Sequence, residues 1–188
     1  MAKRTPTPSQ TLGPFFAYGL LREDDADVAG PDAAGERIVL AGALKDKNGA
    51  PVRDALIEVW QADAAGRMPG RDADADPAVK GFGRTLTKED GGFSFRTILP
   101  GASAGGGNKA QAPHFAIGVF SAGLTRRVLT RVYVPGADGL QDDEIFGALS
   151  DAERKSLVAV ACDDENGARR LEFQIRLAGD GATTAFVD

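Results

Sequence analysis

Apolar and polar positions alternate with a period of two along much of the chain, which is the pattern of β-strands with one buried face. Between residues 170 and 177, Leu171, Phe173 and Ile175 are separated by polar residues, and a similar alternation begins at Ile38. Further apolar runs follow at intervals of roughly ten residues, with turn residues between them. The pattern predicts a mainly β fold, a β-sandwich of roughly eight short strands. The predicted strands cover residues 37–43, 54–61, 82–87, 93–98, 113–120, 127–134 and 170–177, with a short edge strand at 183–187.

Two turn signals indicate how some of these strands are connected. Residues 46–49 end in Asn-Gly, the strongest two-residue hairpin signal, so the strands on either side are expected to pair. Residues 88–92 read Lys-Glu-Asp-Gly-Gly and predict a second hairpin between strands 82–87 and 93–98.

Helical signals are confined to the last third of the chain. Ser150 and Glu153 have the spacing of a capping box, and apolar residues follow them at helical spacing. One or two short helices are therefore expected within residues 142–161. The stretches 72–83 and 102–112 have no such pattern and are predicted to be long loops, which often carry function or an interface.

The first 36 residues show little periodicity. The segment from Thr7 to Phe16 contains two prolines and a glycine, and proline without a backbone donor fits poorly within a central strand. We therefore predict an extended N-terminal arm that runs over a surface. The expected organisation is an arm and loop at residues 1–36, followed by the β-sandwich domain at residues 37–188.

Composition sets further limits on function. The chain has 188 residues, a net charge of −5 and no basic run, so it fits one domain and nucleic-acid binding is disfavoured. No apolar stretch approaches the ~18 residues of a membrane span, and the N-terminus lacks the apolar segment of a signal peptide. The lone Cys162 rules out an internal disulfide. These features predict a cytoplasmic protein.

Three motifs in the middle of the chain point to one family. Residues 55–63 read Ala-Leu-Ile-Glu-Val-Trp-Gln-Ala-Asp, residues 81–85 read Gly-Phe-Gly-Arg-Thr, and residues 90–101 read Asp-Gly-Gly-Phe-Ser-Phe-Arg-Thr-Ile-Leu-Pro-Gly. In these motifs the chain resembles the intradiol ring-cleavage dioxygenases. The resemblance extends over nearly the whole chain, because it also covers the segments 7–15, 112–114, 129–133, 171–177 and 184–188.

The resemblance implies a ferric site whose ligands this chain largely lacks. Members of the family hold the iron with two tyrosines and two histidines, and the corresponding positions here are Met68, Ala102-Ser103, Ala112 and His114. Ferric iron prefers anionic oxygen donors, for which a thioether is a poor substitute. The chain is therefore expected to bind no metal. His114 can instead be a strand histidine bonded to a neighbour or lying at an interface.

The family also implies a partner. Its protocatechuate-cleaving branch is built from two homologous chains, of which the beta chain binds Fe(III) and the alpha chain completes the substrate pocket. This chain resembles the iron-free partner. The resemblance therefore implies a hetero-oligomer with a homologous beta chain, in which dioxygen cleaves protocatechuate, a small aromatic substrate, to 3-carboxy-cis,cis-muconate.

The same resemblance assigns pocket residues to the arm. It implies that Thr11, Gly13, Pro14 and Phe15 reach into the pocket formed with the beta chain. A Gly-Pro segment is stiff and has few side-chain atoms, so its backbone can approach a small aromatic ring. The alternative is an arm that simply wraps a partner.

Arg131 is the remaining candidate. Because it lies mid-strand among apolar neighbours, its charge calls for an anionic partner, such as the carboxylate of protocatechuate. The alternatives are an ion pair with an internal acid or a position on a solvated outer face.

Two other functions stay open. One is a self-sufficient dioxygenase with improvised ligands, such as Asp72 or Asp76 together with His114. The other is a non-enzymatic binding module that reused the sandwich after losing its metal. The fold cannot decide between them, because one scaffold hosts unrelated functions.

Overall fold

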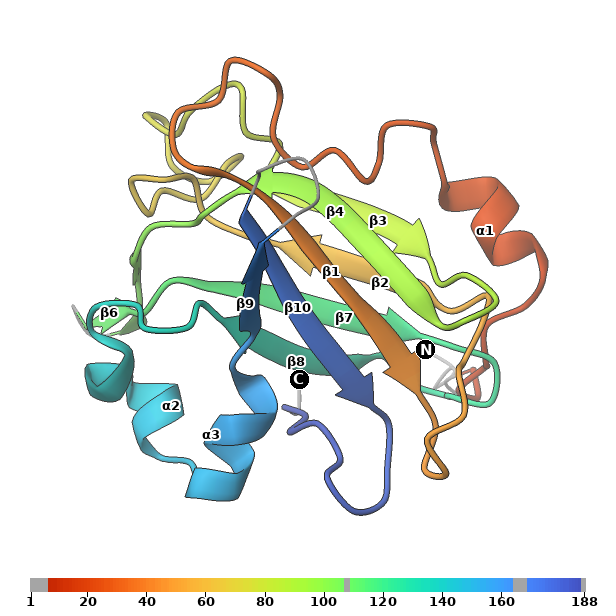
Figure 1. Ribbon diagram of the computed structural model, residues 1–188. Helices are drawn as coiled ribbons and strands as arrows, with labels where there is room; N and C mark the ends of the chain where they lie inside the picture. Colours follow the sequence, from red (N-terminus) through yellow and green to blue (C-terminus); the bar gives the residue numbers. More distant parts are fainter. Residues whose placement is uncertain (1–6, 107–108, 164–168, 187–188) are drawn as a thin grey trace, which may run out of the picture.

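The computed structural model describes residues 7–106, 109–163 and 169–186. Two four-stranded sheets face each other and enclose the core (Figure 1), which confirms the predicted mainly β sandwich. The first sheet has the order β4-β1-β10-β9 and the second β3-β2-β7-β8. The strands are β1 (Arg37–Lys45), β2 (Leu56–Trp60), β3 (Phe82–Leu86), β4 (Gly92–Ile98), β7 (His114–Phe120), β8 (Val128–Tyr133), β9 (Val160–Asp163) and β10 (Arg169–Arg176), with a small separate pair, β5 (Ser103–Ala104) and β6 (Ala110–Gln111).

The core consists of the inward-facing residues of both sheets. Leu40 and Leu171 from the first sheet and Ile57 and Phe115 from the second are completely buried in one hydrophobic cluster. Burying a side chain of this kind contributes about 1.5–3 kcal/mol relative to leaving it in water. The period-two pattern of the sequence therefore identifies the buried face correctly.

Both predicted hairpins are wrong, although the turns exist. At the first turn the side chain of Asp46 accepts hydrogen bonds from the backbone of Asn48 and Ala50 at 2.8 and 2.9 Å. The chain then crosses to the other sheet, so β1 pairs with β4 and β10 while β2 pairs with β3 and β7. The turn at residues 88–92 likewise joins strands of different sheets. Turn residues encode a reversal of direction, but not which sheet the next strand enters.

The described residues form three short α-helices, where the sequence predicts one or two. They are α1 (Phe15–Leu20), α2 (Glu144–Gly147) and α3 (Asp151–Leu157), with a 3₁₀ turn, η2 (Leu140–Asp142), before α2. The predicted capping box forms at α3: the backbone N–H of Ser150 donates to the Glu153 carboxylate at 2.8 Å, and the backbone N–H of Glu153 donates to the Ser150 hydroxyl at 3.4 Å.

The C-terminal predictions are corrected in two places. Residues 160–163 form β9 instead of continuing a helix. The expected strand at 183–187 is reduced to one bridge between Phe186 and Leu129, and position 187 lies outside the described residues. In the described ranges no helix is long and apolar enough to cross a membrane.

Part of the N-terminal segment belongs to the sandwich. Val28 is fully buried, and its backbone N–H donates to Arg96 of β4 at 2.9 Å. On the other side, the N–H of Arg84 in β3 donates to the carbonyl of Asp25 at 3.0 Å. This segment therefore closes one edge of the sandwich between its two sheets.

Candidate functional site

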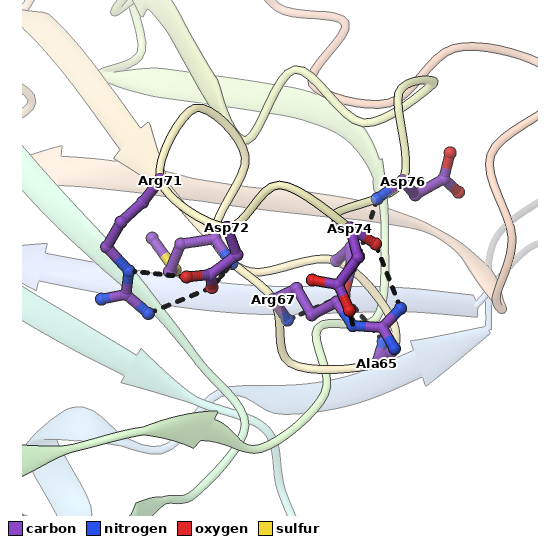
Figure 2. A network of polar contacts seen from close by, with 8 residues as sticks. Ala65, Arg67, Arg71, Asp72, Asp74 and Asp76 are labelled. Atoms are coloured by element: carbon purple, nitrogen blue, oxygen red, sulfur yellow. Dashed lines mark hydrogen bonds and ion pairs between the residues drawn. The ribbon is translucent and has the colours of Figure 1, made fainter.

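A polar network holds the loop between β2 and β3 (Figure 2). Its centre is Asp63, which is 2% exposed and whose carboxylate accepts from the backbone N–H groups of Ala65, Arg67 and Asp76, each at 2.9 Å. An ion pair between Arg67 and Asp74 at 3.0 Å closes the loop on the outside. The loop is thus held by its own residues.

Met68 lies in this loop, at the position that the family resemblance aligns with the first tyrosine ligand. Its backbone N–H donates to Asp72 at 2.7 Å, and Arg71 bonds the same carboxylate at 3.1 Å. The hydrogen bond from Arg71 and that from the Met68 backbone hold the pKa of Asp72 below its usual value. Gly66 brings the loop against the next ligand position: its φ is +81°, and a Cβ there would lie 1.8 Å from the carbonyl oxygen of Ala102. Only glycine permits this approach.

His114 is oriented by its own backbone. Its Nδ1 lies 2.7 Å from the carbonyl oxygen of Ala112. Since a carbonyl only accepts, Nδ1 carries the proton and Nε2 keeps the lone pair. Burial, and secondly the charge of Arg131, lowers the pKa of His114 to about 4. The imidazole is therefore neutral at pH 7, as in the interpretation of a strand histidine bonded to a neighbour.

The buried carboxylate of Asp143 connects the backbone just before His114 to helix α2. It is 1% exposed and caps α2, accepting from the backbone of Ile145 and Phe146 at 3.0 and 2.9 Å. It also accepts from the backbone N–H of Ala112 at 2.9 Å and from the hydroxyl of Tyr133 at 3.2 Å. A single buried carboxylate thus ties the start of β7 and the end of β8 to helix α2.

Arg131 lies beside His114 on the neighbouring strand. In the register of β7 and β8, Ala116 is opposite Arg131 and His114 is opposite Tyr133. The guanidinium of Arg131 reaches Gln111 Oε1 at 3.4 Å and the Tyr133 hydroxyl at 3.5 Å, and both partners are neutral. The ion pairs found among the described residues do not include Arg131, so the alternative of an internal ion pair is not realised within them.

At three of the four positions that align with ferric ligands, the residues do not fit ferric iron. Met68 offers a thioether, Ala112 offers no donor, and His114 lies beside a fixed positive charge that disfavours a cation. The carboxylate of Asp72 is engaged within its own loop, and that of Asp76 accepts from Ala34 and Ala78. Within the described ranges no group of three or more His, Cys, Asp or Glu could hold a metal.

The arm is attached to the sandwich through Thr11. Its hydroxyl donates to the carbonyl of Ser121 at 3.3 Å and accepts from the backbone N–H of Gly123 at 2.7 Å. The arm then leads into α1, where Phe15 and Tyr18 are 81% and 87% exposed. Beneath it lies an open groove of about 740 Å³, lined in part by Gly13 and Pro14.

The predicted site residues fall into two groups. Thr11, Gly13, Pro14 and Phe15 lie together at the end of the sandwich that Figure 1 shows beside α1. Arg131 is opposite Ala116 on β7, and the arm is anchored at Ser121. Ser121 lies five residues after Ala116, which is about 17 Å along an extended strand. The chain by itself therefore does not bring Arg131 and the arm to one place.

Sequence reasoning missed two residues of the Arg131 region, Gln111 and Asp143. Gln111 lies in a segment that was expected to be a loop and forms β6 instead. Asp143 is the N-cap residue of α2, and an aspartate in front of a helix is a local sequence signal for such a cap. Its bond to Ala112 spans 31 positions in the chain, and the sequence pattern has no signal for such a contact.

Comparison with known proteins places this geometry in a family. A family description of dioxygenases matches residues 12–179. The protocatechuate 3,4-dioxygenase alpha chain of Pseudomonas putida is 35% identical, over 96% of this chain and 95% of that one. The chain therefore belongs to the intradiol ring-cleavage dioxygenase family, whose members generally depend on Fe(III). The alpha chain of Burkholderia cepacia is 33% identical, over 96% of both chains, and the beta chain of that species is 39% identical, over 79% of this chain and 67% of its own length.

Solved structures agree with this assignment in fold. The dioxygenase domain of a carbohydrate-binding fusion protein from Streptomyces sp. SirexAA-E matches 93% of this chain and 99% of its own, with 24% identity and a TM-score of 0.63. Catechol 1,2-dioxygenase from Acinetobacter sp. ADP1 matches 85% of this chain with 23% identity and a TM-score of 0.66, and this chain spans 58% of it. Both share the sandwich.

Proposed function

We propose that this chain is the iron-free alpha subunit of a protocatechuate 3,4-dioxygenase. It would pair with a homologous beta chain that binds Fe(III), and the complex would cleave protocatechuate with dioxygen to 3-carboxy-cis,cis-muconate in the cytoplasm. The observation that carries the proposal is the mismatch at the ligand positions, where Met68 and Ala112 replace a tyrosine and a histidine. Its main support is the full-length similarity to alpha chains.

The arm is the proposed contribution of this chain to the partner's pocket. The N-terminal region, residues 1–36, would contact the beta chain chiefly through the arm and α1. Phe15 and Tyr18 are aromatic and almost fully exposed, which is the character of residues that anchor protein interfaces. Gly13 and Pro14 present backbone with little side chain, so Thr11 and these two residues can approach a small ring from outside.

Arg131 is the proposed source of carboxylate recognition. Among the described residues no acid forms an ion pair with Arg131, so it can attract and orient protocatechuate, whose carboxylate it would bind through paired N–H groups. Ala116, opposite Arg131, and Ser121, where the arm is anchored, are about 17 Å apart along β7. Arg131 and the arm would therefore contribute to substrate binding from two separate places on this chain.

Co-expression with the homologous beta chain tests this proposal. Turnover of protocatechuate should require both chains, and the variant Gly13→Val should lower turnover in the assembled complex, because no atom lies within 4 Å of a Cβ at this position in the chain itself. Gly106→Val is a matched control, since a Cβ there also has open space but lies away from the arm. Equal turnover by both variants would refute the role of the arm, and a beta chain that is fully active by itself would favour a non-enzymatic binding module.

A further inference from the structure

The surface around α1 is apolar and open on both sides of the arm. Phe15 and Tyr18 project from α1 and are 81% and 87% exposed. The groove of about 740 Å³ lies between α1 and the sandwich, and a second groove, of about 510 Å³, runs along the other side of the arm. Leu12 and Gly13 line both grooves, so the two are continuous across the arm. An exposed apolar area rimmed by polar residues marks a site of protein contact.

The arm and α1 are held in this position without a partner. Thr11 bonds the backbone of the turn between β7 and β8, where its hydroxyl donates to the carbonyl of Ser121 and accepts from the N–H of Gly123. Phe16, on the inner side of α1, packs against Phe120 at the end of β7, with ring centroids 5.7 Å apart. The surface is therefore preformed, and a molecule that binds it has few additional groups to order.

The two grooves carry charges of opposite sign. Asp54 lines the larger groove, and Arg126 lines the smaller one together with Arg127. Both Asp54 and Arg126 are exposed. The carboxylate of Asp54 lies 3.7 Å from its exposed neighbour Arg53, which is too far for a hydrogen bond. The ion pairs found among the described residues do not include Arg126. Asp54 and Arg126 can therefore both pair with a second molecule.

The backbone fixes the position of Asp54. Its φ is +57°, in the left-handed region, which aspartate and asparagine tolerate better than most side chains. The N–H of Asp54 donates to the carbonyl of Thr87 at 3.1 Å, and the next N–H, that of Ala55, donates to the buried hydroxyl of Thr87 at 2.9 Å. The carboxylate is thus presented from a rigid turn, and asparagine can replace it without changing the backbone.

We propose that two copies of this chain associate through this surface as a two-fold symmetric dimer, in which Asp54 of each copy pairs with Arg126 of the other. A surface with one sign of charge calls for a partner of the opposite sign. A surface with both signs complements itself after a two-fold rotation, because each contact between two different residues then occurs twice. Phe15 and Tyr18 would be buried at the centre, and the two ion pairs at the rim would set the orientation.

The dimer affects assembly with the beta chain. The proposed function assigns the same arm and α1 to the contact with the beta chain, so one surface cannot serve both partners at once. The beta chain would therefore displace the second copy as the complex forms. This competition rests on the proposed function, whereas the dimer of the isolated chain does not.

Sedimentation equilibrium of the purified full-length chain measures the dimer and its Kd. Asp54→Asn should raise the Kd about tenfold, because two ion pairs are lost in each dimer. Arg126→Asp should raise it further, because it places two carboxylates opposite each other. In the Arg126→Asp background, Asp54→Asn should instead lower the Kd, since it then removes a repulsion. Lys155→Glu is the matched charge-reversal control, because Lys155 is exposed on α3, which lies apart from α1 (Figure 1), and it should leave the Kd unchanged.

Two results would overturn the dimer surface. One is a chain that stays monomeric at its highest soluble concentration. The other is a dimer that Asp54→Asn weakens equally in the parent chain and in the Arg126→Asp variant, or does not weaken at all. A beta chain that binds while the dimer remains intact would contradict the proposed role of the arm in the subunit contact, and the dimer surface would stand.

Discussion

Replacing Asp143 with alanine should destabilise the chain more than any exposed cap replacement. Asp143 accepts four hydrogen bonds, two within its own helix turn and two from the distant groups Ala112 N–H and the Tyr133 hydroxyl. Loss of the helix cap costs about 1 kcal/mol. Each buried donor left without an acceptor costs about 1–3 kcal/mol more, and water that enters the space compensates in part. We therefore expect Asp143→Ala to lower the free energy of unfolding by about 3–5 kcal/mol.

Chemical denaturation and thermal melting measure this effect. For a chain of this size, the loss corresponds to a decrease in Tm of about 10 °C. Ser150→Ala is the matched control, because it removes the cap of α3 at an exposed position and should cost only about 0.5–1 kcal/mol. Asp143→Asn keeps one acceptor oxygen and should fall between the two. If Asp143→Ala cost no more than Ser150→Ala, Asp143 would not tie β7 and β8 to α2 as described.

The remaining predictions concern pH, substrate and partner. Because the pKa of His114 falls from 6.5 to about 4 on folding, the unfolded chain binds more protons than the folded chain between these two pH values. The free energy of unfolding should therefore fall by up to about 3 kcal/mol as the pH drops from 6.5 to about 4. Denaturation measured at each pH should show that His114→Asn lacks this pH-dependent loss of stability. In the mixed complex, Arg131→Ala should reduce turnover of protocatechuate about tenfold more than turnover of catechol, whereas equal losses would exclude carboxylate recognition. Phe15→Ala and Tyr18→Ala should change the stability of the chain by less than about 0.5 kcal/mol yet weaken association with the beta chain at least about tenfold, as sedimentation or mass photometry would show; unchanged association would remove α1 from the interface.

Much of the fold follows from local patterns. The alternation in residues 170–177 identifies β10 and its buried face, and the capping box identifies the start of α3, because both depend on neighbours in sequence. Sheet membership does not follow: the turn after β1 has ordinary hairpin chemistry, yet the chain crosses to the opposite sheet. Helix α1 was missed because Pro14 suggests an extended arm, although proline is well tolerated at the start of a helix.

The sequence predicts which residues belong to the candidate site, but not how they are arranged in space. Motif spacing identifies the positions of Met68, Ala112 and His114 and shows what they lack. The proximity of Arg131 to His114 depends on the register of β7 against β8, which alternation alone leaves free to slip. The separation between Arg131 and the arm follows from the same register.

Iron content, measured on this chain purified by itself and on its complex with the beta chain, decides whether the iron belongs to the partner. We expect negligible iron and no oxidation of catechols for the single chain, with iron in the complex in proportion to the beta chain. Stoichiometric iron and ring cleavage in the purified single chain would contradict it.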